Sequence, residues 1–190
     1  MKKIVIFASG SGTNAQRIAE YFSANDQVAL TRVYCNKSDA HVLTRAGYLG
    51  IPTMVFDKKD FYEAGVVLQK LLADNPALIV LAGFLWLIPS NILDAFPGRI
   101  INIHPALLPK FGGKGMYGSR VHEAVIGSGD KESGISIHYV NERYDEGDII
   151  FQSKCRVIDS DTPDSLAAKI HALEYEHYPK IIARLLGVET

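Results

Sequence analysis

Two polar side chains stand at the end of an apolar segment, "RIINIHP", that is typical of a buried strand. Asn102 and His104 lie two residues apart, so they project from the same face of a strand, and Pro105 stops that strand. Asparagine supplies a neutral N–H donor, and histidine supplies a group that changes charge near neutral pH. The pair predicts a clamp for the oxyanion of an acyl-type carbonyl, with His104 as general acid.

A third group is needed to set the protonation of that histidine. Asp145 is the best candidate, because it lies in the polar turn "RYDEGD". No serine or cysteine nucleophile accompanies the pair, which favours direct transfer to a bound nucleophile over a covalent acyl-enzyme. The alternative stays open that Asn102 and His104 bond loop backbone and that Asp145 is an ordinary turn residue.

A glycine-rich loop, "SGSGTNAQ" at residues 9–16, lies between an expected first strand and first helix. Such a loop directs backbone N–H groups and a positive helix end at an anion. A dinucleotide site would also need an acidic residue after the second strand, where the chain has Asn36 and Lys37. A single phosphate is therefore the preferred ligand, and a glycine turn required only for packing is the alternative.

The residues that carry this chemistry must be positioned by a sheet. Up to residue 105, apolar β-branched segments alternate with segments of helical spacing. The strands are expected at 3–8, 28–35, 52–56, 77–83 and 99–105, and the helices at 14–25, 38–50, 59–75 and within 89–98. This alternation predicts an α/β fold with a mostly parallel, twisted sheet and helices on both faces.

The pattern changes after residue 105. A glycine-rich loop at 111–119, which is either a mobile lid or a surface loop, precedes a short helix at 120–129. Residues 133–141 alternate like a half-exposed strand, and they are expected to form an antiparallel hairpin with 147–158. A long last helix spans 161–187, opened by Asp161 or Thr162 with Pro163 in its first turn. We expect one domain, residues 1–190.

Composition narrows the class of partner. The 190 residues are 47% hydrophobic and 22% charged, with a formal net charge of −1, so no broad basic field is available for nucleic acid. No apolar stretch approaches a membrane span. Neither the two cysteines, Cys35 and Cys155, nor His122, His138 and His171 have spacing that predicts a metal site. His138 falls on an expected strand, and the other two histidines are expected on helix surfaces. Buried, reduced thiols fit the cytoplasm.

Five motifs occur in a fixed order: "SGSGTN", "VLAGFL", "INIHPALLP", "SGISIHYV" and "YDEGDII". Together they resemble the phosphoribosylglycinamide formyltransferases, folate-dependent enzymes of purine synthesis, over nearly the whole chain. The resemblance implies a single-domain, Rossmann-like formyltransferase fold. It also implies transfer of the formyl group of 10-formyltetrahydrofolate to the amine of 5-phosphoribosylglycinamide, without a metal, by a cytoplasmic monomer or homodimer.

The resemblance also implies roles for residues. Asn102, His104 and Asp145 would be the catalytic trio. The implied substrate phosphate and ribose contacts are Gly12, Thr13, Asn14, Lys59 and Glu174. The implied folate contacts are Phe84, Leu85, Trp86, Leu87, Arg99, Tyr139, Val140 and Asn141. Trp86 stands where many relatives have a basic residue, so it would either stack on the folate or pack in the core.

Several alternatives remain. Methionyl-tRNA formyltransferase shares the chemistry but is expected to need a second domain and a basic surface. Formyltetrahydrofolate deformylase would pass the formyl group to water. A non-catalytic phosphate- or nucleotide-binding module would use the first glycine-rich loop but would leave the trio unexplained. A dehydrogenase is disfavoured by the missing acidic residue after the second strand.

Overall fold

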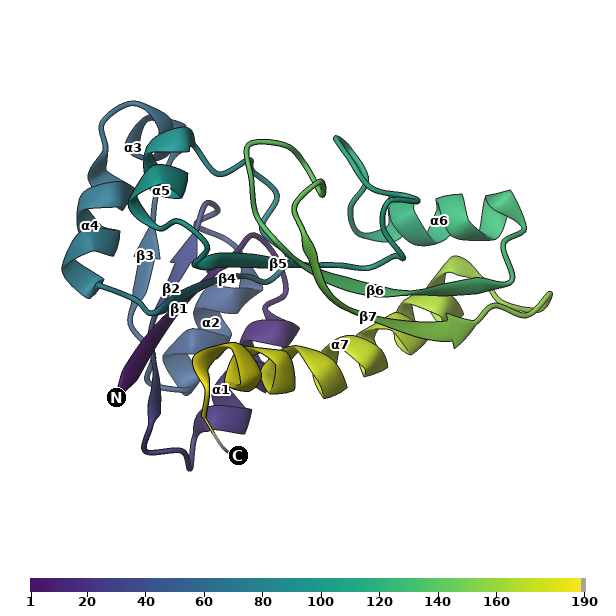
Figure 1. Cartoon of the computed structure of the whole chain (residues 1–190), viewed down its shortest axis with the longest axis horizontal. Helices are drawn as coiled ribbons and strands as arrows, with labels where there is room; N and C mark the ends of the chain where they lie inside the picture. The colour runs from purple at the N-terminus through teal and green to yellow at the C-terminus, as the bar shows by residue number, and fades with distance from the viewer. Residues whose placement is uncertain (189–190) are drawn as a thin grey trace.

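The computed structural model describes residues 1–188 and contains a seven-stranded sheet in the order β3-β2-β1-β4-β5-β6-β7 (Figure 1). The strands are β1 Lys2–Ala8, β2 Val28–Cys35, β3 Thr53–Val55, β4 Leu78–Leu81, β5 Ile100–His104, β6 Glu132–Tyr139 and β7 Ile149–Arg156. The first five pair in parallel, and β6 runs antiparallel to both β5 and β7. The predicted mostly parallel sheet with a terminal antiparallel hairpin is confirmed.

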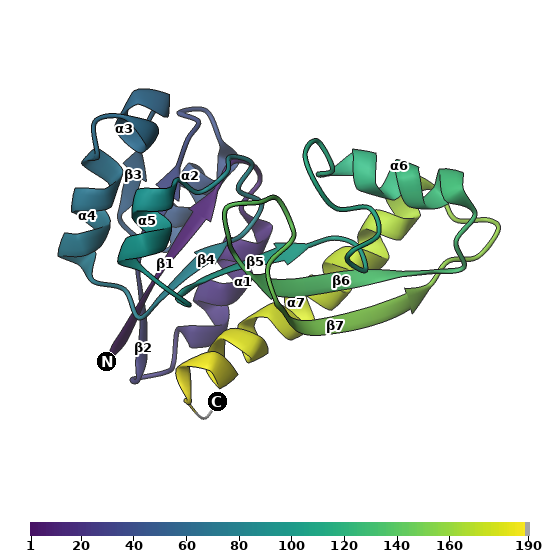
Figure 2. The same ribbon diagram turned by 45° about the horizontal axis from the view of Figure 1, so that its top comes forward.

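Helices cover both faces of the sheet, as predicted (Figures 1 and 2). The helices are α1 Thr13–Phe22, α2 His41–Tyr48, α3 Lys58–Tyr62, α4 Val66–Asp74, α5 Ser90–Ala95, α6 Ser119–Ser128 and α7 Pro163–Leu186. Apolar side chains of α1, α2 and α7 share one buried cluster, and those of α3, α4 and α5 share the other. The two clusters lie on opposite sides of the sheet, so the central strands are enclosed.

The first strand explains why this enclosure forms. Ile4 and Ile6 belong to one cluster, and Val5 and Phe7 belong to the other. Alternate residues of a strand point to opposite faces, so a continuously apolar strand requires a packed layer on each side. All four of these side chains are fully buried.

Two local predictions are wrong. The helix expected at 59–75 is divided into α3 and α4, because Gly65 adopts a left-handed conformation with φ 67° and begins the second helix. β6 is buried along most of its length instead of half exposed. The alternating pattern did not reveal that α7 packs on one face of this strand. Residues 106–108 cover the other face, where Ser136 Oγ donates to the Ala106 carbonyl and accepts from the Leu108 N–H.

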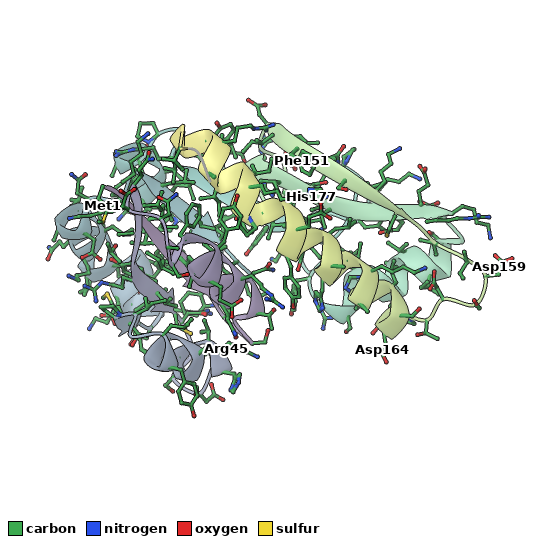
Figure 3. All side chains as sticks on the ribbon, turned by 90° about the horizontal axis from the view of Figure 1, so that it is seen from below. Met1, Arg45, Phe151, Asp159, Asp164 and His177 are labelled. Atoms are coloured by element: carbon green, nitrogen blue, oxygen red, sulfur yellow. The ribbon has the colours of Figure 1, made fainter. Side chains whose placement is uncertain are left out.

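The last helix runs across the sheet (Figure 3). Thr162 and Ser165 form a reciprocal capping box at its start, with Pro163 in the first turn. Further along, the His177 ring lies 4.9 Å from the Phe151 ring of β7, and the Tyr178 hydroxyl donates to the Leu81 carbonyl at 2.9 Å. The contacts of His177 and Tyr178 hold this part of the helix in a fixed position on the sheet. Within residues 1–188, no helix combines the length and the apolar character needed to cross a membrane.

Candidate active site

A cavity of about 670 Å³ lies at the carboxyl ends of the parallel strands. Its walls come from four separate parts of the chain, namely residues 9–14, 81–88, 102–105 and 113–118, together with single residues from other elements. The cavity lies where the sheet order reverses direction, because β1 is flanked by β2 on one side and β4 on the other. This is the place at which open α/β sheets bind ligands.

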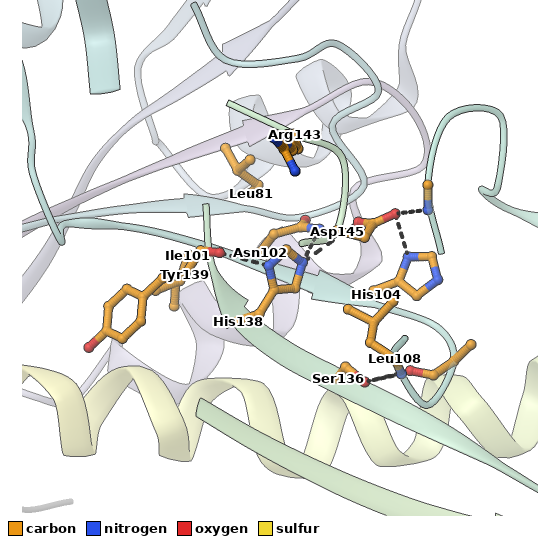
Figure 4. A network of polar contacts seen from close by, with 12 residues as sticks. Leu81, Ile101, Asn102, His104, Leu108, Ser136, His138, Tyr139, Arg143 and Asp145 are labelled. Atoms are coloured by element: carbon orange, nitrogen blue, oxygen red, sulfur yellow. Dashed lines mark hydrogen bonds and ion pairs between the residues drawn. The ribbon is translucent and has the colours of Figure 1, made fainter. Parts of the chain in front are cut away.

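The structure brings together the three residues predicted to be catalytic (Figure 4). His104 Nδ1 lies 3.5 Å from Asp145 Oδ2, while its Nε2 lies 2.8 Å from the carbonyl oxygen of Phe111. Asn102 and His104 share the face of β5 that lines the cavity. The trio therefore forms one cluster although Asp145 is 41 residues beyond His104 in the chain.

Local backbone conformation places the aspartate. Asp145 has φ 58°, in the left-handed region that short polar residues tolerate best. A Cβ atom on Gly147 would overlap the carbonyl oxygen of Tyr139, so only glycine allows this loop to fold back so closely. Asp145 Oδ2 also accepts a hydrogen bond from the Gly113 N–H at 2.9 Å. The carboxylate is thus held from two sides.

Burial and neighbouring polar groups have opposing effects on the pKa values of His104 and Asp145. Burial lowers the pKa of His104 below its ordinary value, against the Asp145 charge and the Phe111 carbonyl, which favour the charged ring. Burial alone would raise the pKa of Asp145, but the neighbouring His138, the His104 charge and the Gly113 N–H together lower it. Asp145 is therefore ionised at neutral pH, and burial favours the neutral form of His104.

A fourth polar residue, His138, belongs to the same cluster (Figure 4). Its Nε2 lies 3.1 Å from Asn102 Nδ2 and 3.6 Å from Asp145 Oδ1, and its Nδ1 lies 2.8 Å from the Tyr139 carbonyl. Sequence reasoning placed it only on a folate-contacting strand. The antiparallel pairing that sets Asn102 opposite His138 joins segments 36 residues apart, and no local pattern predicts it.

The predicted phosphate loop lies beside this cluster. Gly12, Thr13 and Asn14 all line the cavity, and no side chain caps the start of α1, so its first N–H groups remain available to an anion. Asn14 Nδ2 donates to Glu174 Oε2 at 2.9 Å. Glu174 is only 6% exposed, and burial raises its pKa to about 7 against the opposing Asn14 hydrogen bond.

The predicted folate contacts divide into two groups. Residues 84–87 and Val140 line the cavity, whereas Tyr139 and Asn141 do not. Trp86 lines the cavity and also packs in an aromatic cluster with Phe56, Phe61, Tyr62 and Phe84. It is therefore both a core residue and a residue that a ligand in the cavity can contact. Some main-chain groups of this wall are already bonded, since the Leu85 N–H donates to Ser9 Oγ and the Leu87 carbonyl accepts from the Tyr62 hydroxyl.

Two predicted binding residues lie elsewhere. Lys59 lines a separate cavity together with Asn36, Lys58 and Trp86. Arg99 precedes β5 at the opposite end of the strand from His104, where it lines a small cavity near the N-terminus and stacks over Phe96. The structure does not bring either residue to the cavity that holds the trio.

Other charged or titratable side chains reach the cavity without having been predicted to bind. They are Lys37, Lys114, His122, Arg143 and His171. His122 was expected on a helix surface, but it is buried, because its face of α6 turns toward the cavity and α7. Across the described part of the chain, residues 1–188, no three histidine, cysteine, aspartate or glutamate residues gather closely enough to bind a metal.

Comparisons with known proteins agree with this geometry. The family described as Formyl transferase matches residues 2–182. A phosphoribosylglycinamide formyltransferase of Bacillus subtilis is 36% identical over 100% of this chain and 97% of its own length. A chloroplastic one of Arabidopsis thaliana is 42% identical over 97% of this chain, which spans 65% of that relative's length.

Solved structures give the same result. The crystal structure of phosphoribosylglycinamide formyltransferase from Streptococcus pneumoniae superposes with a TM-score of 0.86 at 35% identity, covering 98% of this chain and 99% of that one. The enzyme of the same name from Bacillus halodurans gives 0.88 at 36% identity, with 97% and 95% covered. Fold, cavity and sequence therefore agree that this chain belongs to the formyl transferase family.

Proposed function

We propose that this protein transfers the formyl group of 10-formyltetrahydrofolate to the amine of 5-phosphoribosylglycinamide, a step of purine biosynthesis. The observation that carries the proposal is the convergence of Asn102, His104 and Asp145 on the cavity that also contains the phosphate loop. A phosphorylated amine and a formyl donor need these two features side by side. The names of the relatives support the same pair of substrates.

Asn102 and His104 act on the formyl carbonyl. As the amine attacks the formyl carbon, a C–N bond forms and the carbonyl oxygen gains negative charge, which the Asn102 N–H and the His104 ring stabilise. His104 and Asp145 carry a proton from the attacking nitrogen to the departing folate nitrogen. The neutral amine and the formyl donor exchange one formyl group for one proton, and an amine that arrives as an ammonium releases one further proton to solvent.

The remaining walls bind the two substrates. Gly12, Thr13 and Asn14 hold the phosphate through the start of α1, and Glu174 accepts hydrogen bonds from the ribose. The apolar wall formed by residues 84–87 and Val140 takes the flat ring of the folate. Lys59 and Arg99 are left out of these roles because they lie outside the cavity.

We further propose that residues 1–190 act as one domain on small molecules only, without nucleic acid or membrane, as a monomer or homodimer. Both cysteines are free, which fits work in a reducing compartment such as the cytoplasm. Size-exclusion chromatography with light scattering distinguishes the two oligomeric states.

The test is a direct assay. The protein is incubated with 10-formyltetrahydrofolate and 5-phosphoribosylglycinamide, and the deformylated folate is followed by absorbance. The proposal expects product only when both substrates are present, with formylated ribonucleotide in equal amount. Product formed at the same rate without the ribonucleotide would identify a hydrolase, and absence of product with bound ligands would identify a binding module.

A further inference from the structure

We propose that His138 is a positioning residue that orients the side-chain amide of Asn102 toward the formyl oxygen. The inference rests on the proposed function, because it concerns the group that receives charge during formyl transfer. It adds a residue to the trio and assigns that residue one task. The observation behind it is the contact of His138 Nε2 with Asn102 Nδ2 in the wall of the cavity (Figure 4).

The tautomer of His138 follows from its second contact. Nδ1 lies 2.8 Å from the main-chain carbonyl oxygen of Tyr139. A carbonyl oxygen only accepts, so Nδ1 must carry a proton. In the neutral ring the Nε2 atom then has a lone pair and no proton. The carbonyl that follows His138 in its own strand thus selects which ring nitrogen faces the cavity.

The tautomer in turn determines the orientation of Asn102. An Nε2 lone pair accepts a hydrogen bond from an N–H group and repels an amide oxygen. The Asn102 amide therefore directs Nδ2 toward His138, at 3.1 Å. One N–H is donated to the imidazole, and the second N–H of the same amide is left for an oxygen in the cavity. Without this partner, the amide is free to rotate and present its oxygen there instead.

The competing partner of Nε2 is Asp145. Its Oδ1 lies 3.6 Å from Nε2, which is longer than a hydrogen bond, whereas the Asn102 contact is within range. His138 is 2% exposed, and its strand pairs Asn102 directly opposite it. Asp145 and His104 are the other titratable groups that face this corner from the neighbouring loop and strand. A charged His138 would turn its Nε2 proton toward Asp145 and would oppose the Asn102 N–H.

The first test reads the tautomer and needs no activity. In ¹⁵N-histidine-labelled protein at pH 7.5, we expect the His138 resonances of a neutral ring with a protonated Nδ1 and an unprotonated Nε2. The His138→Gln spectrum assigns them by difference. Resonances of a neutral ring with the proton on Nε2, or of a doubly protonated ring, would overturn the inference, because Asn102 could not donate to either.

The second test separates positioning from packing. His138→Leu removes the acceptor, and His138→Gln places an amide oxygen near the position of Nε2. For the Leu variant we expect kcat to fall about 10- to 100-fold with KM for both substrates changed less than about 3-fold. The Gln variant should recover most of that loss. His41→Gln, an exposed histidine outside the cavity, is the matched control and should retain wild-type kcat.

A double variant completes the argument. If His138 acts through Asn102, then adding His138→Leu to Asn102→Ala should change kcat by less than about 3-fold, because the group to be oriented is already gone. Additive losses, or a Leu variant with wild-type kcat, would refute the positioning role while wild-type formyl transfer continues. Failure of the wild-type protein to transfer formyl groups would instead count against the proposed function.

Discussion

The imidazole of His104 lies between two oxygen acceptors, the Phe111 carbonyl and the Asp145 carboxylate. Such surroundings favour an imidazolium, yet burial lowers the pKa of His104. Because burial outweighs the two acceptors, the neutral ring is favoured, and this form can accept a proton as a general base.

Replacement of His104 by alanine tests this role. We expect kcat for formyl transfer to fall by about 10²- to 10⁴-fold, because proton transfer and part of the oxyanion stabilisation are lost. Binding of the ribonucleotide, measured by calorimetry, should change little, since the phosphate loop is intact. A variant that keeps more than a tenth of wild-type kcat would remove His104 from the mechanism.

Glu174 gives a prediction on stability at the same scale. Its pKa is raised from 4.5 to about 7, chiefly by burial. Below pH 4 the carboxyl is protonated in folded and unfolded chains alike and contributes nothing to the pH dependence. Between these two pKa values only the unfolded chain ionises, so stability falls as pH rises, by on the order of 3 kcal/mol in total, and then levels off.

The variant Glu174→Gln removes this titration while it keeps an acceptor for Asn14. Urea unfolding of both proteins at pH 4.5, 6 and 8 measures the difference in unfolding free energy. The variant should gain on wild type steadily between pH 4.5 and 7, by on the order of 3 kcal/mol, with no further gain above. A difference that does not change with pH would mean that Glu174 ionises normally in the folded protein.

At the scale of elements, the loop from β1 to α1 depends on its contact with α2. Gly12 has φ 75°, and a Cβ atom there would lie 2.5 Å from Val42 Cγ2 and 2.7 Å from Val42 Cα. The Val42 N–H donates to the Gly10 carbonyl at 3.0 Å. The close approach of α2 therefore shapes the loop, and glycine is required both for conformation and for space.

Gly12→Ala is expected to destabilise the protein by about 2–4 kcal/mol, from left-handed strain and overpacking together. It should also raise KM for the ribonucleotide more than KM for the folate, because the phosphate N–H groups move with the loop. Gly10→Ala is the matched control, since a Cβ there meets no atom within 4 Å. Equal stability of the two variants by thermal unfolding would contradict this account of the loop.

At the scale of the whole molecule, one cavity draws on both ends of the chain. The phosphate loop follows the first strand, Glu174 belongs to the last helix, and the two are joined by the Asn14 hydrogen bond. The order of the strands places these distant segments side by side at the centre of the sheet (Figure 2). Ligands that fill the cavity should therefore stabilise the fold as a whole, because they contact segments from both ends of the chain.

Ligand-dependent thermal unfolding measures this coupling. At about 100 times its Kd, a ligand that binds only the folded protein adds about 2.7 kcal/mol, which raises Tm by roughly 5–10 °C in a chain of this size. The ribonucleotide and a folate analogue should each produce a single, shifted transition. The His104→Ala variant should shift equally, and no shift with either ligand would argue against both binding sites.

Local patterns predicted the elements well because each depends on neighbours in the sequence. The apolar runs of β1 and β4, the Pro163 at the start of α7 and the pair Asn102 and His104 all carry their signal within a few residues. Errors arose where long-range packing decided the result. The single helix expected at 59–75 is divided, since α3 ends at Tyr62 and α4 begins after Gly65, and α7 packs on a strand that alternates like a half-exposed one.

By itself, the sequence determined a mostly parallel sheet, a fifth strand that carries Asn102 and His104 at its end, and a glycine-rich loop before the first helix. Strand periodicity and turn chemistry depend on neighbouring residues, so these features can be predicted locally. Only the tertiary structure decided that His138 joins these residues and that Lys59 and Arg99 do not. Those facts depend on which strands pair and which end of a strand faces the cavity. Chain folding sets both through contacts between residues that are far apart in the sequence.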